Sequence, residues 1–455
     1  METMADYTID GASSEQNKLL TSIAEHFAIT PALLTTVSSN VYDYLKTGQQ
    51  NPTSTWLSTI TTDIADKIRD ATKQQKVGLG LSINTEGRRL KIASIKFTPR
   101  GQADAINKQV FFFDAKQNVT PGQLLEDIAG RVAEFVNSHE LAGPLPLGVT
   151  IDWPVEEMAG GGKVAGGLFA GVDIGLALNA VLMKLHLPVR VTSTINCVVS
   201  TLVTAQHRLH NTRVALILNH GINASYYEWQ EGGGGEGEGN GRRVAINTEL
   251  AHFKSPALPL TQWDHRVDRE SVTPGSHRFE KLVADKYLGE IVRNLVTDFM
   301  DAQLIFQKNA DASVFSEPYS FFTSYMTIVE DKTRDLREVG ELLKAGFNIN
   351  ASLVDRQIVS ALCHIVSVRA AKLVGAAVAG VVRRADEAAK EEEGDASSPA
   401  VVSISGQLTE MNQPYVQCTT ATAQALIADL GLPQPAFTVL GEDGYTVGAA
   451  LSSFT

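Results

Sequence analysis

The segment DHRVDRESVTPGSHRFEKLVADKYLGEIVR, residues 264–293, decides the fold of this chain. It begins with two aspartates four positions apart, Asp264 and Asp268, and passes through the turn signal Pro274-Gly275. It then enters a helical pattern that extends from Phe279 to Gln307. The order of these residues is specific, and the segments on either side determine how it is interpreted.

The size and charge of the chain limit its architecture and its partners. It has 455 residues, of which 44% are hydrophobic. A chain of this length is too long for one compact unit, so we expect two lobes or about three subdomains. A net charge of -12 repels nucleic acids and anionic membranes, and neither is expected as a direct partner. Cys197, Cys363 and Cys418 lack the spacing of a disulfide framework or a zinc site. This favours a reducing, cytoplasmic compartment and no metal site.

The alternation of short β-rich runs with long helical patterns predicts an α/β protein of mixed sheets covered by helices. An all-helical start of about 70 residues is expected, with Thr30-Pro31 as a helix-start signal inside it. Thr120-Pro121 repeats that signal. Strands are expected at 77–97, 109–113, 144–154, 189–195, 214–218 and 244–248, and further helices at 279–307 and 355–384.

Several biased segments are interpreted as loops or tails. The glycine-rich stretch 158–175 favours a flexible loop over a phosphate site, because no Gly-Lys-Ser/Thr ending follows it. Residues 230–243 and 385–399 are expected to be disordered. The apolar run 373–382 is shorter than the roughly 20 residues of a membrane span, so a buried helix is expected. Residues 1–14 lack the basic and apolar segments of a signal peptide.

Four strings, in this order along the chain, make it resemble the hexokinase family. Ile246-Asn247-Thr248-Glu249 with Phe253 resembles the family's Ile-Asn-Thr-Glu-Trp-Gly-Ala-Phe, and the segment quoted first ends in the family's Tyr-Leu-Gly-Glu-Ile. Cys363 with 366–371 resembles its Cys-x-x-Val-Ser-x-Arg-Ala-Ala helix, and 442–451 resembles its C-terminal adenosine-side motif. The resemblance covers residues 15–453.

The resemblance implies the two-lobe, actin-like (ribonuclease-H-like) ATPase fold of hexokinases. Residues 1–14 would be a disordered N-terminus. The N-terminal helices and the small lobe would take residues 15–195, and the large lobe residues 196–440. The C-terminal segment 441–455 would return to the small lobe.

The catalytic base of the family is replaced in this sequence. The family's Ile-Asn-Asp-Thr-Val-Gly-Thr-Leu falls on residues 195–202, so Cys197 stands where the base aspartate would be. A thiol with a pKa of about 8.5 is a poor proton acceptor at neutral pH, and nearby carboxylates would raise its pKa further. A small buried filler is therefore favoured over a nucleophilic cysteine. Asp152 replaces the serine of the family's Ser-Phe-Pro and is a candidate for a relocated base.

The nucleotide-facing motifs also depart from the family. Asp-Leu-Gly-Gly-Thr-Asn is placed on residues 80–85, where Ile83 would crowd a phosphate. The family's Gly-Thr-Gly-x-Asn falls on residues 219–223, where Gly221 is kept. His220 in this string is interpreted as a loop residue rather than a catalytic group. Gly-Ser-Gly-Lys-Gly becomes 444–448, which keeps Gly444 and Gly448 but places Tyr445 where the nucleotide would lie.

The sugar-facing residues are better preserved. The resemblance implies that five residues contact a hexose: Asp152, Asn196, Asn223, Glu249 and Glu280. The family's Trp-Thr-Lys-Gly-Phe string, which closes over the sugar, has no counterpart here.

Together these features favour a hexokinase-like protein that is catalytically inactive and retains hexose binding. Such a protein resembles degenerate fungal hexokinase relatives, which act with protein partners in carbon-source regulation, in the cytoplasm and in the nucleus. The alternative is an active, divergent ATP-dependent hexose kinase that needs Mg-ATP and forms hexose 6-phosphate. A third interpretation is a pure hexose sensor.

Overall fold

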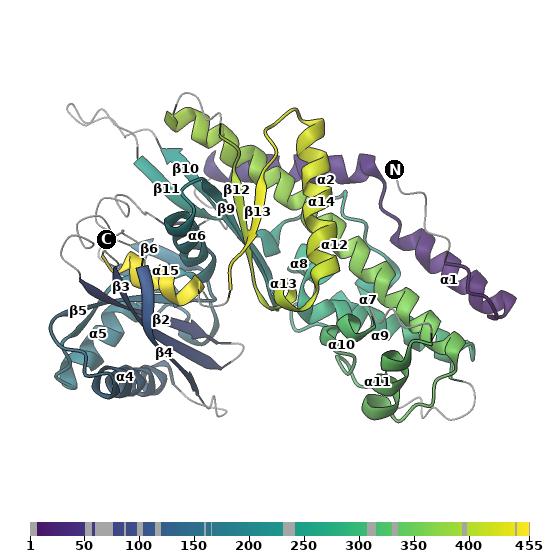
Figure 1. Ribbon diagram of the computed structural model, residues 1–455, viewed down its shortest axis with the longest axis horizontal. Helices are drawn as coiled ribbons and strands as arrows, with labels where there is room; N and C mark the ends of the chain where they lie inside the picture. Colours follow the sequence, from purple (N-terminus) through teal and green to yellow (C-terminus); the bar gives the residue numbers. More distant parts are fainter. Residues whose placement is uncertain are drawn as a thin grey trace.

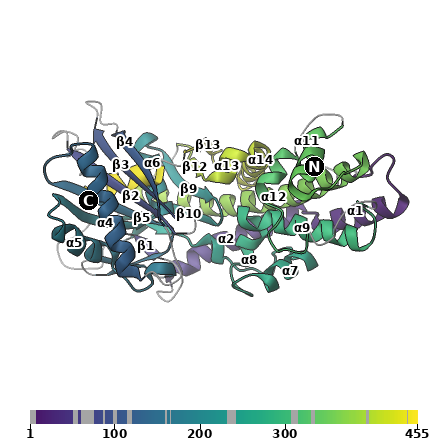
Figure 2. The same cartoon turned by 90° about the horizontal axis from the view of Figure 1, so that it is seen from below.

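The computed structural model of this protein describes residues 7–50, 57–59, 76–85, 88–97, 103–113, 120–158, 161–164, 166–230, 242–306, 315–329, 335–393, 398–441 and 444–454. Two lobes lie side by side, one built around a five-stranded sheet and the other around a six-stranded sheet with many helices (Figure 1). The view from below shows the same elongated arrangement, with α1 at the end of the large lobe far from the small one (Figure 2).

The chain begins with two helices on the large lobe. Ser13 caps α1 (Ser14–Phe27): its hydroxyl accepts the Gln16 N–H, and the Gln16 side chain accepts the Ser13 N–H. The predicted start of α2 (Pro31–Gln50) at Thr30-Pro31 is confirmed. The predicted all-helical start was too long, because residues 57–59 form strand β1 (Leu57–Thr59), which pairs with β11 (Arg242–Asn247). Disorder does not extend to residues 7–13, where Ile9 exchanges hydrogen bonds with Asn17.

The small lobe is a mixed sheet with the strand order β4-β3-β2-β5-β8. Its strands are β2 (Val77–Asn84), β3 (Arg89–Phe97), β4 (Ala103–Phe112), β5 (Leu145–Ile151) and β8 (Val189–Asn196). Leu79, Leu81 and Ile83 share the core with α4 (Pro121–Ser138) and α5 (Ile174–Lys184) on one face. The alternate residue Gly80 faces α15 (Gly444–Ser452) on the other face. The helix signal at Thr120-Pro121 is confirmed, with a capping box at Thr120.

The large lobe is built on a sheet with the strand order β1-β11-β10-β9-β12-β13. The remaining strands are β9 (Thr212–Leu218), β10 (Ile222–Gln230), β12 (Val401–Ser405) and β13 (Ala436–Val439). Leu216 points into the helical core, whereas its neighbours Ala215 and Ile217 point to the face covered by α6 (Cys197–Arg208). Helix α6 and helix α15 therefore lie between the two sheets (Figure 1).

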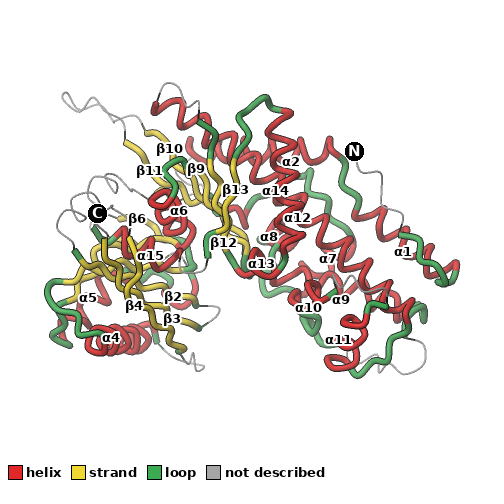
Figure 3. The backbone as a smooth tube through the Cα atoms, viewed as in Figure 1, coloured by secondary structure: helices red, strands yellow, loops and turns green. Residues whose placement is uncertain are grey.

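Most of the large lobe is helical (Figure 3). Its helices are α7 (Gln262–Glu270), α8 (Arg278–Val283), α9 (Asp285–Asp301), α10 (Thr323–Ile328), α11 (Arg337–Phe347), α12 (Leu353–Glu393), α13 (Gln407–Met411) and α14 (Gln413–Asp429), with the one-turn helix η2 (Leu250–His252). The helical run predicted from Phe279 is two helices, because Ala284 has an extended backbone between them.

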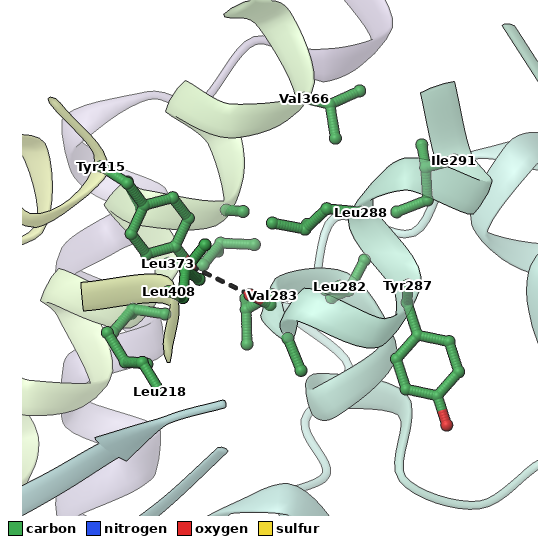
Figure 4. Close-up of a cluster of buried hydrophobic side chains, with 14 of the residues drawn as sticks. Leu218, Leu282, Val283, Tyr287, Leu288, Ile291, Val366, Leu373, Leu408 and Tyr415 are labelled. Carbon is green, nitrogen blue, oxygen red and sulfur yellow. Dashed lines mark hydrogen bonds between the residues drawn. The ribbon is translucent and has the colours of Figure 1, made fainter. Parts of the chain in front are cut away.

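In the core between α8, α9, α12 and α14, the Tyr415 hydroxyl donates to the Val283 carbonyl at 3.0 Å (Figure 4).

Helix α12 crosses the centre of the large lobe. Among the described residues it alone is long and apolar enough to span a membrane by length and composition, over Leu353–Glu391. In its most apolar window 89% of the residues are buried against the rest of the fold. A helix that is apolar all round is expected where neighbours cover every side, and the prediction of a buried helix is confirmed.

Two loop predictions were wrong. The strands β6 (Val155–Met158) and β7 (Gly161–Val164) pair antiparallel, and the one-turn helix η1 (Gly167–Phe169) follows them. Glycine is required next to these strands because a Cβ on Gly167 would lie 2.4 Å from the indole of Trp153. Residues 385–393 are helical rather than disordered, because buried Arg384 pairs with Glu228 and ties this end of α12 to the sheet. Residues 231–241 lie outside the described residues.

Candidate sugar site between the lobes

The first part of the site lies where two parallel strands of the small lobe end together. β5 pairs with β8 so that Ile151 lies opposite Asn196, and Asp152 and Cys197 therefore follow at the same edge of the sheet. Asn196 caps α6, since its Oδ1 accepts the Val198 N–H at 2.9 Å and its Nδ2 donates to the Trp153 carbonyl at 3.0 Å. The amide predicted for sugar binding thus also fixes the start of the helix that carries Cys197.

The second part comes from the large lobe and is centred on the carboxylate of Glu249. Asn223 Nδ2 donates to Asn247 Oδ1 at 2.8 Å, and Asn247 Nδ2 donates to Glu249 Oε1 at 2.7 Å. Burial raises the pKa of Glu249 to about 7, although the hydrogen bonds from Asn247 and Asn223 act in the opposite direction. Asn247 was not predicted as a site residue, yet it links the two residues that were. It lies inside the quoted string Ile-Asn-Thr-Glu, which could have signalled it.

Cys197 is close enough to both parts of the site for the charges of Asp152 and Glu249 to act on its thiol. Loss of solvation, then the charge of Asp152, then that of Glu249 raise the pKa of its thiol far above the usual range. Its side chain packs beside the apolar cluster that α6 shares with the large-lobe sheet. The thiol is therefore protonated at neutral pH, as expected for a filler and not for a base or a nucleophile.

Asp152 is held by a neighbour that the sequence analysis missed. Its Oδ2 accepts the Thr85 N–H at 2.8 Å, and the Thr85 hydroxyl lies 3.0 Å from Oδ1 and 3.1 Å from Oδ2. The Trp153 indole N–H donates to the same hydroxyl at 2.9 Å. Thr85 thus engages both carboxylate oxygens, and a proton taken up by Asp152 would compete with these hydrogen bonds.

Glu280 reaches the site from the first turn of α8. It lies against Gly221, where a Cβ would come within 2.5 Å of Glu280 Oε2. Gly221 was predicted on the nucleotide side, but in the structure its missing side chain makes room for a sugar-side carboxylate. His220 lies in the bend between β9 and β10, as predicted, and its Nδ1 is 3.3 Å from Asp285 Oδ2.

Of the two C-terminal glycines predicted on the nucleotide side, Gly448 is required for helix packing. A Cβ on Gly448 would lie 1.9 Å from the backbone oxygen of Ser200, so α15 can approach α6 only with glycine there. Gly444 begins α15, and its carbonyl accepts the Thr204 hydroxyl at 2.6 Å. Tyr445 is half-buried against the same apolar cluster as Cys197.

The motif placed on residues 80–85 is not a loop. Residues 77–84 form β2, in which Ile83 is buried in the small-lobe core and Gly80 faces α15. The strand ends before Thr85, which lies in a turn. The prediction that Ile83 crowds a phosphate was therefore wrong, because the register of the motif was placed too early in the chain.

Comparison with known proteins identifies the family of this chain. Two family models, both described as hexokinase, match residues 19–207 and 213–455. A hexokinase of Kluyveromyces lactis is 30% identical over 331 residues, which is 68% of this chain and 67% of that relative. Hexokinase-5 of Oryza sativa subsp. japonica is 26% identical over 477 residues, which is 97% of this chain and 91% of the relative. The chain belongs to the hexokinase family.

Solved hexokinase structures share the fold. The hexokinase from Schistosoma mansoni complexed with glucose superimposes with a TM-score of 0.79 at 22% identity, and the match covers 96% of this chain and 99% of that one. Another solved hexokinase gives a TM-score of 0.77 at 18% identity over 97% of this chain and 99% of that one. The predicted two-lobe, actin-like α/β fold of hexokinases is confirmed.

Two residues predicted on the nucleotide side of this hexokinase-family chain bear on a fit to Mg-ATP, one in the loop after β9 and one in α15. Phosphates require donors, such as backbone N–H groups in a glycine-rich turn. In the loop predicted for this purpose, the buried Oδ1 of Asn219 is an acceptor without a partner. Gly448 lies where α15 packs against α6, so its missing side chain makes room for the Ser200 backbone oxygen.

Proposed function

We propose that this hexokinase-family protein binds a hexose between its lobes without phosphorylating it. Two features observed together carry the proposal. A protonated thiol stands at the position that the family motif gives to the base, and a hydrogen-bonded chain of sugar-side groups lies near it. Transfer of phosphate to a hydroxyl requires a group that accepts the hydroxyl proton. Cys197 does not supply one, whereas the Asn223–Asn247–Glu249 chain supplies acceptors and donors suited to hexose hydroxyls.

The proposal is tested by measuring binding and turnover on the same purified protein. Glucose, the ligand named for the Schistosoma mansoni structure, is titrated in a calorimeter and in a thermal unfolding assay, with Mg-ATP in parallel. A ligand at 100 times its dissociation constant stabilises the protein by about 2.7 kcal/mol. We expect a shift with glucose, no shift with Mg-ATP and no hexose 6-phosphate. Absence of glucose binding, or steady formation of hexose 6-phosphate, contradicts the proposal.

Active hexose phosphorylation with Asp152 as the base is the second candidate. It is favoured by one observation, namely that the Asp152 carboxylate lies close enough to Cys197 to raise the pKa of the thiol. Under this candidate, Asp152→Asn abolishes turnover, while Cys197→Ser leaves it unchanged. The hydrogen bonds from Thr85 weigh against it, since they favour the ionised form of the Asp152 carboxylate and so oppose its uptake of a proton.

A hexose-binding protein without turnover would act through protein partners, and we propose a role in carbon-source regulation in the cytoplasm or the nucleus. Lobe closure on the sugar would then change the surface offered to a partner. The test is affinity capture from cell extract with and without glucose, using Glu249→Gln as the matched control. Partners that the native protein retains only with glucose, and that the variant does not retain, support this role. An identical set under all conditions contradicts it.

A further inference from the structure

His252 and His277 lie against each other where η2 meets α8. Their Nε2 atoms are 3.0 Å apart, and their ring centroids are 4.1 Å apart with the planes at 79°. This is hydrogen-bonding geometry in which one ring donates its N–H and the other accepts with its lone pair. Position 252 corresponds to the alanine in the family string Ile-Asn-Thr-Glu-Trp-Gly-Ala-Phe, so this link is not implied by the family motif.

Each histidine is three residues from a glutamate of the sugar side. His252 follows Glu249, and its Nε2 is 3.9 Å from Glu249 Oε2. His277 precedes Glu280, which occupies the first turn of α8. The imidazole pair is therefore a direct connection between the two short segments that carry the predicted hexose carboxylates.

The two segments also pack together on their buried side. The rings of Phe253 and Phe279 meet edge to face with centroids 5.6 Å apart. Glu249 and His277 both have left-handed backbones, with φ of 46° and 52°. Such conformations cost non-glycine residues energy and persist only where the surroundings hold them. The Phe253–Phe279 contact and the imidazole pair both join the two segments and provide that support.

The surroundings of the pair keep it uncharged at neutral pH. Burial, then His252 and Lys281, with Lys254 and Lys286 beyond, lower the pKa of His277 to about 4. Burial and Lys254 also lower the pKa of His252. Neutral rings are what this hydrogen bond needs, because two protonated rings would place two N–H groups face to face.

We propose that His252 and His277 are positioning residues whose mutual hydrogen bond sets the spacing of Glu249 and Glu280 and thereby the affinity for hexose. The inference rests on the proposed function. It adds a specific determinant of affinity, formed by residues that do not themselves touch the sugar.

The experiment compares glucose affinity and unliganded thermal stability in six proteins, including one control. These are the native chain, His252→Ala, His277→Ala, the double variant and His277→Gln, with His210→Ala on the exposed surface as a control. We expect each single alanine variant to weaken glucose binding about fivefold to tenfold, the value of one neutral hydrogen bond. Because either substitution breaks the same bond, we expect the double variant to be no weaker than the singles. His277→Gln should restore affinity, since its amide can donate to His252.

The outcomes separate this inference from the proposed function. If the native protein binds no glucose, both fail. If the native protein binds glucose and the alanine variants bind equally well, or if their effects add as at independent sites, the positioning role is wrong while sugar binding stands. Equal losses in His277→Gln and His277→Ala also overturn it, because a structural role would not distinguish the two.

Discussion

Replacing Glu249 by glutamine should stabilise the protein in alkaline solution while it weakens hexose binding. Burial raises the pKa of this carboxyl from 4.5 to about 7. The folded state therefore holds the proton more tightly than the unfolded state. The resulting stabilisation is complete below pH 4.5 and is lost as pH rises through 7. Glutamine keeps the acceptor for Asn247 Nδ2 and has no charge to bury.

The size of the effect follows from the two pKa values. The difference between 4.5 and about 7, at about 1.4 kcal/mol for each pKa unit, corresponds to about 3 kcal/mol once the carboxyl is fully ionised. At pH 5.5 the same linkage amounts to only about 1 kcal/mol. We therefore expect the free energy of unfolding of Glu249→Gln to exceed that of the native chain by an amount that grows by about 2 kcal/mol between these conditions.

Urea unfolding of both proteins at pH 5.5 and pH 8 measures this difference, and glucose titration at pH 8 measures the cost in binding. Glu134→Gln is the matched control, because the Glu134 side chain is half exposed on α4 and its ion pair with Arg131 is a surface contact. The reasoning is refuted if the stability gap between Glu249→Gln and the native chain does not widen from pH 5.5 to pH 8. Destabilisation of the variant by the same amount at both pH values would also refute it.

Two further predictions concern the packing that places the site. Gly448→Ala should destabilise the protein by about 3 kcal/mol or more, because its Cβ would lie 1.9 Å from the Ser200 backbone oxygen. Gly130→Ala should stabilise the protein by up to about 1 kcal/mol, because Gly130 lies in open space on α4. Thermal unfolding of the two variants checks both signs. Asp264→Asn should cost about 3 to 5 kcal/mol, since it leaves the fully buried Arg369 without its charge partner. Urea unfolding measures this loss, and a cost below about 1 kcal/mol would contradict it.

Much of the fold was predictable from local signals. Thr30-Pro31 and Thr120-Pro121 specify helix starts through short-range hydrogen bonds and a fixed proline φ, so they act wherever the chain goes. The apolar surface of residues 373–382 similarly required burial whatever its neighbours. The thiol of Cys197, within the string that resembles the family's base motif, was also readable, because the sequence gives the identity of each side chain directly.

Predictions failed where distant contacts override composition. Residues 385–393 look like a disordered tract, yet the Arg384–Glu228 pair between α12 and β10 keeps them helical. The glycine-rich stretch looks like a flexible loop, but its glycines admit the ring of Trp153. Composition carries no information about a partner that lies far away in the sequence, so these segments were misjudged.

The sequence by itself indicated the lobed α/β architecture, the thiol of Cys197 at the position that the family motif gives to the base, and the predicted sugar-side residues, since each of these inferences depends on side-chain chemistry or on spacing within one segment. Only the tertiary structure decided that Asp152 is held by Thr85, that Gly221 makes room for Glu280, that Gly448 is a packing residue and that His252 meets His277. The physical reason is that hydrogen bonds and close approaches depend on positions within about 1 Å, and those positions are set by the packing of elements from both lobes.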